Sequence, residues 1–325
     1  MVVVSVIIPT FNYANFICYA IESVLEQVHN VEVEIIVVDD GSTDDTKNVL
    51  KPFIASGKIK YFYQSNNGKA SATSFAIEQC SGKYIFNLDA DDLFLPDKIA
   101  RSVAIFENDI SIVHVASPAK LIYDETDDFK IENIPIGIIY RAIDGAELLY
   151  YFYNLNMLFG GGTTFAARAS TLKKIKIPPA VDMYIDEFLI LAILPFGKSY
   201  LISEALSVWR VHQNNYSNAH LKQGNRLIKA QRLLKSSDAI LLYLQNNKFE
   251  HALVNIFRLK NFTENITLLE NERKKKILDI VGYAFKTFVV LRPNLSQLKN
   301  YHVINRLIPT VFFKFLKGFL KKTTV

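Results

Sequence analysis

Three aspartates stand within four positions directly after an apolar run, in the stretch FNLDADDLFLP of residues 86–96. Asp89, Asp91 and Asp92 repel one another, so the group is costly unless a positive charge is held beside it. Hard divalent cations such as Mg2+ and Mn2+ prefer oxygen ligands, and a metal ion that also binds phosphate would account for the carboxylates. The alternative is a solvated turn in which Asp92 caps the following helix. Taken alone, the D-x-D spacing favours the turn.

A second acidic group, Asp39 and Asp40, ends another short apolar run in VVDDGSTDDT. The glycine that follows favours a turn, and the Ser42 and Thr43 hydroxyls can cap the next helix. A carboxylate here can accept a hydrogen bond from a nucleotide base or a ribose hydroxyl, with helix capping as the alternative. We expect Asp40 to lie at the same edge of a sheet as Asp91, which favours a binding role.

Strand and helix patterns alternate through the first ninety residues. The expected strands cover residues 3–8, 33–38, 59–65 and 83–89, and the expected helices cover 14–28, 44–56 and 69–80. This alternation predicts an α/β fold with a mainly parallel sheet covered by helices on both faces. Ligands of such sheets bind beyond the carboxyl ends of the strands, where the clusters PTFNY, DDGSTDD, SNNGK and DADD all fall.

The regular alternation of strands and helices loosens from about residue 100, and strands are no longer expected beyond about residue 220. Residues 97–107 are expected to be a helix, 111–116 a strand, 124–133 an acidic loop, 186–197 a buried helix that ends at Gly197, and 199–212 one or two edge strands. Strand signals fade beyond about residue 220, and helices are expected at 226–245, 249–261 and 272–290. We therefore predict a catalytic domain at residues 1–220 and a helical region at residues 221–325.

Composition narrows the class of protein. Half of the 325 residues are hydrophobic, which is enough for a large core, and no apolar run reaches the roughly 18 residues of a spanning helix. The opening VVVSVIIPT has no basic leader and is expected to be a buried strand. Cys18 and Cys80 have no metal-binding spacing, and a cytoplasmic location is expected.

The net charge of +5 is concentrated at the C-terminus. No acidic residue follows Asp279, whereas eight lysines and arginines do. The segment 309–325 would form a helix with lysines on one face and phenylalanine and leucine on the other, which suits an anionic membrane surface at the inner face of the plasma membrane. Packing on the preceding helices or on a second subunit, as in a homodimer, is the alternative. No nucleic-acid partner is expected.

Taken together, the motifs resemble the family 2 glycosyltransferases of the GT-A fold. The resemblance spans about residues 3–217 and is carried in order by VSVIIPTFNYANFICYAIESVLEQ, EIIVVDDGSTDDT, NNGKASATSFAIEQCSGKYIFNLDADDLFLP, IDEFLILAILPFG and LSVWRVHQNN. It implies an inverting enzyme that moves a sugar from a nucleotide diphosphate to an acceptor hydroxyl. It further implies a Rossmann-like sheet, a UDP-sugar as the usual donor, and a glycan or lipid-linked acceptor in bacterial capsule, lipopolysaccharide or wall synthesis.

The resemblance also assigns donor-binding roles, position by position. It implies that Pro9, Thr10 and Phe11 contact the nucleoside, with the Phe11 ring stacking on the base. The remaining assignments are Asp40 to the base or ribose, Lys69 to the base or a phosphate, Asp89 to the ribose and sugar, and Asp91 to a Mn2+ or Mg2+ ion, while Asp92 shapes the turn.

The catalytic base is less regular, because the family usually presents a Glu-Asp pair where this chain has Ile185 and Asp186. An inverting displacement needs a carboxylate beside the acceptor hydroxyl to take its proton. Counting back from Gly197 with the family spacing selects Asp186, with Glu187 as the fallback. Acids of a first helical turn that favour the helix dipole are the alternative. His212 in WRVHQNN matches a family histidine that helps to hold the metal or the diphosphate.

Other classes of protein fit less well. A haloacid-dehalogenase phosphatase would need an aspartate where Val38 stands, and a nicotinamide oxidoreductase would need G-x-G-x-x-G where this chain has PTFNY. The rival from another class is a non-catalytic scaffold that descends from a transferase. The joint presence of Asp40, Asp91, Asp186 and His212 argues against it.

Overall fold

The computed structural model describes residues 3–27, 31–123, 129–134, 136–155, 160–212, 215 and 225–271. Contacts within the chain form two compact units, one of residues 1–149 and 158–213 and the other of residues 150–157 and 214–325. The predicted domain boundary at residue 220 lies outside the described residues and stays a prediction. The inclusion of residues 150–157 in the second unit has no counterpart in the sequence analysis.

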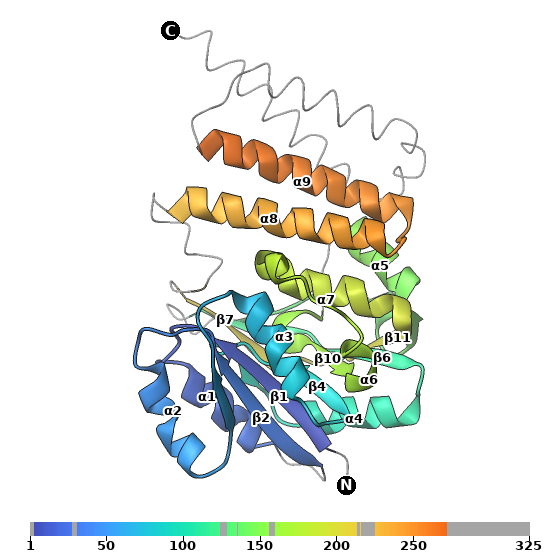
Figure 1. Cartoon of the computed structure of the whole chain (residues 1–325). Coiled ribbons are helices and arrows are strands. Elements are labelled where there is room, and N and C mark those ends of the chain that lie inside the picture. The colour runs from blue at the N-terminus through green and yellow to red at the C-terminus, as the bar shows by residue number, and fades with distance from the viewer. Residues whose placement is uncertain are drawn as a thin grey trace. The chain divides into compact units, whose positions relative to one another are not determined.

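The first unit is built on an eight-stranded sheet with the strand order β3-β2-β1-β4-β10-β6-β11-β9 (Figure 1). Its strands are β1 (Val3–Thr10), β2 (Glu32–Asp39), β3 (Lys60–Tyr63), β4 (Tyr84–Asn87), β6 (Ile112–Ala116), β9 (Ala142–Asp144), β10 (Ala166–Arg168) and β11 (Lys198–Leu201). Strands β3, β2, β1 and β4 are all parallel, whereas β10 runs antiparallel to both β4 and β6. The carboxyl ends of the four parallel strands therefore share one edge, as the sequence predicts.

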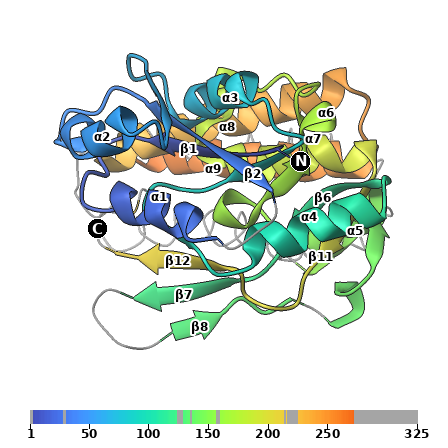
Figure 2. The same cartoon turned by 90° about the horizontal axis from the view of Figure 1, so that it is seen from below.

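Helices cover both faces of this sheet. The helices of the first unit are α1 (Ile17–Leu25), α2 (Thr46–Ala55), α3 (Lys69–Gln79), α4 (Lys98–Asn108), α6 (Ala169–Leu172) and α7 (Ile185–Ile193), with 3-10 turns at η1 (Ile136–Ile138), η2 (Gly162–Thr164), η3 (Pro179–Tyr184) and η4 (Leu194–Phe196). Helix α5 (Gly145–Leu155) begins in the first unit and ends in the second. Helices α1 and α4 lie on the face opposite α3 (Figure 2). The mixed α/β architecture thus follows the predicted fold class.

The two faces of the sheet are packed differently. Under α1 and α4 the core consists of branched and aromatic side chains, and the Tyr84 ring stacks on Phe106 at a centroid distance of 4.6 Å. The buried residues of α3 are mostly small, namely Ala70, Ala72, Thr73, Ala76 and Ile77. Small side chains let a helix approach a sheet closely. The start of α3 is thereby held near the strand ends.

A four-stranded second sheet has the order β5-β12-β7-β8 and comprises β5 (Leu93–Phe94), β12 (Ser207–Val211), β7 (Ala119–Tyr123) and β8 (Phe129–Ile131). Strand β12 pairs antiparallel with β5, with Ser207 opposite Phe94. Because β5 directly follows the DADD turn, this pairing carries the end of β12 back to that turn. The expected acidic loop at 124–133 is wrong in part, since β8 lies within it, and β7, β9 and α5 were not predicted.

The second unit contains a helical hairpin of α8 (Asn225–Asn246) and α9 (His251–Asn271), which lie side by side (Figure 1). Its buried apolar residues include Ile240, Leu244, Ile256 and Phe257. The expected helix at 272–290 and the basic segment 309–325 lie outside the described residues. Among the helices that the structure describes, none combines the length and the apolar character needed to span a membrane.

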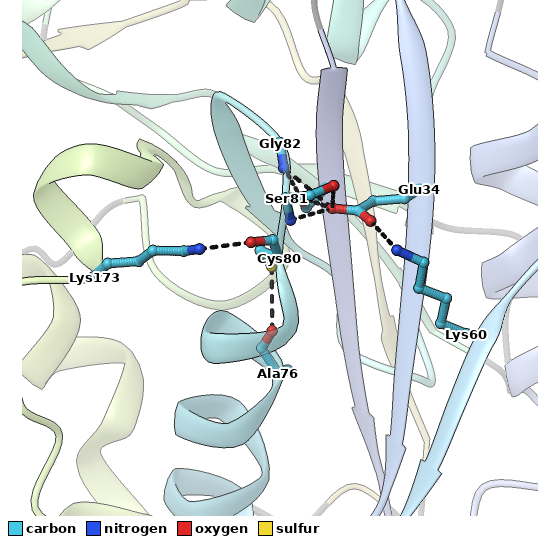
Figure 3. A network of polar contacts seen from close by, with 8 residues as sticks. Glu34, Lys60, Ala76, Cys80, Ser81, Gly82 and Lys173 are labelled. Carbon is cyan, nitrogen blue, oxygen red and sulfur yellow. Dashed lines mark hydrogen bonds and ion pairs between the residues drawn. The ribbon is translucent and has the colours of Figure 1, made fainter.

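A polar network closes the amino-terminal end of the main sheet around Glu34 of β2 (Figure 3). The Glu34 carboxylate accepts hydrogen bonds from the Ser81 and Gly82 backbone N–H groups at 2.6 and 3.1 Å and from the Lys60 ammonium at 2.6 Å. The Ser5 hydroxyl adds a donor at 2.5 Å. Burial by itself raises the pKa of Glu34, but these donors outweigh burial and hold it at about 2. The network joins β1, β2, β3 and the turn before β4.

Candidate active site

The loops that follow β1 and β2 are tied together by Asn12. This residue adopts a left-handed backbone with φ 61°, and its side-chain oxygen accepts from the Thr43 backbone N–H at 2.7 Å. Of the three predicted nucleoside contacts, Pro9 and Thr10 are buried within β1, whereas Phe11 is 41% exposed. An exposed ring at this edge is available for stacking.

Asp40 holds the loop after β3. Its carboxylate is buried and accepts from the Gln64 side chain at 2.6 Å, the Asn67 backbone N–H at 2.9 Å and the Gly68 backbone N–H at 2.8 Å. These bonds occupy most of its hydrogen-bonding capacity. Asp40 thus organises the NNGK segment, a role that neither of its sequence interpretations included.

Lys69 joins two acids that are far apart in the sequence. Its ammonium lies 2.9 Å from the Asp89 carboxylate and 3.5 Å from Asp186 Oδ1. Burial acts to lower the pKa of Lys69, but the charges of Asp186 and Asp89 outweigh it and raise that pKa above its ordinary value. The ammonium therefore stays charged and stands between the predicted donor carboxylate and the predicted base. Its contact with a nucleotide base or a phosphate stays a prediction.

The two candidate bases differ sharply in exposure. Asp186 lies in the first turn of α7 with 42% of its side chain exposed, whereas Glu187 is buried with 7% exposed. A general base must reach the proton that it removes. The geometry therefore favours Asp186 over Glu187.

Glycines keep the space beside Asp186 open. A Cβ atom added at Gly162 would lie 3.4 Å from Asp89 Oδ2 and 3.6 Å from Asp186 Oδ2. Gly162 also has φ 52°, in the left-handed region that side chains disfavour. One added at Gly161 would lie 3.0 Å from the Asp186 Cβ. A side chain at either glycine would thus contact the Asp89 or Asp186 side chain directly.

Asp91 and His212 meet at the end of β12. His212 Nε2 lies 3.2 Å from Asp91 Oδ2, and both side chains are buried. The imidazole stacks on the Phe16 ring at 4.4 Å, and the Tyr13 hydroxyl bonds to Asp91. Burial first, and then the charges of Asp91 and Asp89, raise the pKa of Tyr13, so the hydroxyl remains a donor. Asp91 and His212 were both predicted from their motifs, whereas the contacts of Tyr13 and Phe16 with them were not.

One carboxylate and one imidazole are a donor set that suits Mn2+ or Mg2+ with further oxygen ligands from phosphate and water. No group of three or more His, Cys, Asp or Glu side chains placed to hold a metal ion occurs in the described part of the chain. The residues present thus fit a metal ion that is completed by a ligand rather than one enclosed by protein.

Asp92 braces the turn, as the sequence analysis expects. Its carboxylate accepts from the Arg210 backbone N–H at 3.0 Å and from the Thr163 hydroxyl. Burial, with added repulsion from Asp91 and Asp89, raises the pKa of Asp92 well above its usual range. It does not cap α4, because the residue at that N-cap is Asp97. Burial likewise raises the pKa of Asp89, against the effect of Lys69.

The comparison with known families agrees with this geometry. Residues 5–176 match the family described as glycosyl transferase family 2. An uncharacterised glycosyltransferase of Nostoc sp. is 30% identical over 233 residues, which cover 70% of this chain and 71% of the relative. The chain belongs to glycosyl transferase family 2. The resemblance stated from the motifs is confirmed.

Two further relatives match over shorter segments. An uncharacterised glycosyltransferase of Rickettsia bellii is 44% identical over 104 residues, or 32% of this chain and 15% of the relative. The chondroitin synthase of Escherichia coli is 36% identical over 113 residues, or 34% of this chain and 16% of that enzyme. The family 2 chain thus matches a small part of the length of these relatives.

Solved structures confirm the predicted GT-A fold. The 1–349 fragment of S. aureus TarS in complex with UDP-GlcNAc superposes with a TM-score of 0.63 at 18% identity, covering 97% of this chain and 92% of that one. The mannosyltransferase PcManGT of Pyrobaculum calidifontis, in complex with GDP-Man and Mn2+, gives a TM-score of 0.51 at 17% identity and covers 96% and 86%. At such identities the similarity concerns the fold.

Proposed function

We propose that this glycosyltransferase moves a sugar from a nucleotide diphosphate to an acceptor hydroxyl with inversion at the anomeric carbon. The observation that carries the proposal is that Asp89 and Asp186 both lie beside Gly162 and on either side of the Lys69 ammonium. A carboxylate held apart from the predicted donor carboxylate can take the acceptor proton on the face opposite the leaving group. A single displacement of this kind inverts the configuration.

The donor side of the site comprises the loops after β1, β2 and β4. Phe11 is the exposed ring for the base, Asp89 borders the sugar, and the NNGK segment lies where Asp40 holds it. We infer a UDP-sugar, since the TarS fragment of the same fold binds UDP-GlcNAc. Asp91 and His212 would hold a Mn2+ or Mg2+ ion, which would offset the charge on the leaving diphosphate.

Asp186 is the proposed general base. The Asp186 side chain is 42% exposed and thus accessible to an incoming hydroxyl, whereas Glu187 is buried. The Lys69 ammonium lies 3.5 Å from Asp186 Oδ1, on the side of the carboxylate that faces Asp89. The similarity to a bacterial chondroitin synthase supports a glycan or lipid-linked acceptor in surface polysaccharide synthesis.

A panel of nucleotide sugars tests the proposal. We expect Mn2+-dependent release of nucleotide from one donor, most readily a UDP-sugar, and loss of that release in Asp91→Ala. Release of nucleotide by Asp91→Ala at the wild-type rate would refute the assigned metal site. Absence of release from every donor, with and without acceptor glycans, would favour the non-catalytic scaffold instead.

The segment 309–325 lies outside the described residues, and we propose for it either attachment to the inner face of the membrane or packing on the preceding helices or on a second subunit. Flotation of the full chain and of a chain without residues 309–325 on anionic vesicles separates them. Equal flotation of the two would exclude the membrane role.

A further inference from the structure

Lys69 is held at both of its ends by one short segment, residues 182–186. Its backbone N–H donates to Asp182 Oδ1 at 2.7 Å, and its ammonium lies 3.5 Å from Asp186 Oδ1. Asp182 belongs to η3, which runs directly into α7, the helix that carries Asp186. A single turn of chain therefore controls both the start of α3 and the proposed base.

The first turn of α3 depends on this contact. Helix N-termini leave backbone N–H groups without intrahelical acceptors, and the N-cap residue here, Gly68, has no side chain to supply one. The Asp182 carboxylate takes that place from another part of the chain. A negative charge there also interacts favourably with the helix dipole.

Gly68 has to be a glycine for the same reason. Its φ is +90°, and a Cβ atom at this position would lie 2.5 Å from Asp182 Oδ1 and 2.9 Å from Asp182 Cγ. A side chain at Gly68 would push the carboxylate away from the Lys69 N–H. The close fit shows that the two segments are packed against each other at this point.

Two aspartates from separate segments thus accept hydrogen bonds from three successive backbone N–H groups. Asp40, at the end of β2, accepts from Asn67 and Gly68, and Asp182 accepts from Lys69. The NNGK segment is consequently fastened to the donor side by Asp40 and to the base-bearing side by Asp182.

We propose that Asp182 is a positioning residue for the transfer reaction, which sets where the Lys69 ammonium stands between Asp89 and Asp186. It acts through Lys69 and touches no reacting atom. The inference rests on the proposed function, because it matters for turnover only if Asp186 is the base. Loss of Asp182 would free the start of α3 and let the ammonium move away from one or both acids.

The test compares Asp182→Ala with Asp182→Asn, whose amide oxygen can still accept from the Lys69 N–H. We expect Asp182→Ala to lower kcat by about tenfold to a hundredfold, with a smaller change in the donor KM, because small misplacements of a catalytic group have effects of that order. Asp182→Asn should restore most of the turnover. Asp109→Ala is the matched control, since Asp109 also accepts from a backbone N–H, that of Ser111 at 2.8 Å, at the amino end of β6.

Amide hydrogen exchange tests the contact without any assay of activity. The Lys69 amide should exchange faster in Asp182→Ala than in the full-length wild type, and at the wild-type rate in Asp109→Ala. Gly68→Ala should have the same effect from the other side of the contact. The double variant Asp182→Ala/Gly68→Ala should lose little more turnover than either single variant, because both break one interaction.

The outcomes separate the two hypotheses. Unchanged Lys69 exchange in Asp182→Ala overturns the contact, and faster exchange with wild-type kcat overturns the positioning role. Failure of Asp182→Asn to restore turnover also counts against it. Absence of sugar transfer by the wild-type chain would instead refute the proposed function, and the exchange result would still show whether Asp182 holds α3.

Discussion

Carboxylates at the two ends of the main sheet have pKa values that are shifted in opposite directions. At the amino end, Glu34 receives donors on both of its oxygens, and its pKa is held at about 2. At the carboxyl end, Asp92 is buried and Asp89 is half-buried beside further acids, and the pKa of each is raised. An ionised carboxylate therefore stabilises the fold at the amino end of the sheet and destabilises it at the carboxyl end.

The difference shows which end is shaped by function. A charge that is fully satisfied by protein donors has nothing left to offer a ligand. Neighbouring carboxylates that lack enough hydrogen-bond donors lower the stability of the fold. Proteins retain them where a cation or a substrate supplies the compensating charge or donors. Lys69 supplies part of that charge at the carboxyl end, at 2.9 Å from Asp89.

The largest expected effect is at the carboxyl end. Asp186→Asn should lower kcat by about a hundredfold to ten-thousandfold, because it removes the proposed general base. Donor binding and the melting temperature should change little, since Asp186 is 42% exposed. Initial rates and donor titration of the purified variant measure both. A kcat that stays within roughly threefold of the wild-type value would show that Asp186 is not the general base.

At the amino end we expect a loss of stability with no loss of turnover. Glu34→Gln should lower the free energy of unfolding at pH 7 by about 2–3 kcal/mol, from a pKa held at about 2 against the ordinary 4.5. The lowered pKa stabilises the fold above pH 4.5, and this contribution is lost as the pH falls from 4.5 toward 2. Urea unfolding across this pH range checks it. Equal pH dependence in variant and wild type would contradict the network.

Lys98 extends the comparison to a buried cation. It is 2% exposed, packs on the Phe94 ring at 5.0 Å, and burial lowers its pKa to about 7 from an ordinary 10.5. The unfolded chain binds the proton more tightly, so the wild type should gain stability as the pH rises from 7 to 10.5. Lys98→Met should remove that dependence and stabilise the protein at pH 7 by about 1–2 kcal/mol. If Lys98→Met is less stable than the wild type at pH 7, the charge of the Lys98 ammonium is compensated in the folded protein and the prediction is wrong.

The smallest expected change in the free energy of unfolding has the opposite sign to that of Glu34→Gln. Asp91→Asn should stabilise the metal-free protein by roughly 0.5–1 kcal/mol, because it removes one charge from a crowded group, while it abolishes metal-dependent turnover. Thermal unfolding in the presence of a chelator measures the first part. A destabilised Asp91→Asn would show that the two sheet ends do not differ in the way described.

Much of the fold was predictable because its signals are local. The alternation of β-branched runs with helical spacing located the parallel strands from β1 to β4 and the helices between them. The polar clusters after these strands placed the site at one edge, and the family motifs selected Asp91, Asp186 and His212 for it. The strands β8 and β9 have three residues each, which is too few to show a period.

Local pattern by itself determined the sheet, its carboxyl edge and the types of acid that gather there, because strand and helix periods and turn residues act over a few positions. The tertiary structure decided what each acid does. The partner of Asp182 is 113 positions away in the sequence, and His212 is 121 positions from Asp91. No short-range pattern encodes such pairs, since they arise only when packed elements bring distant segments together and burial decides which charge stays exposed.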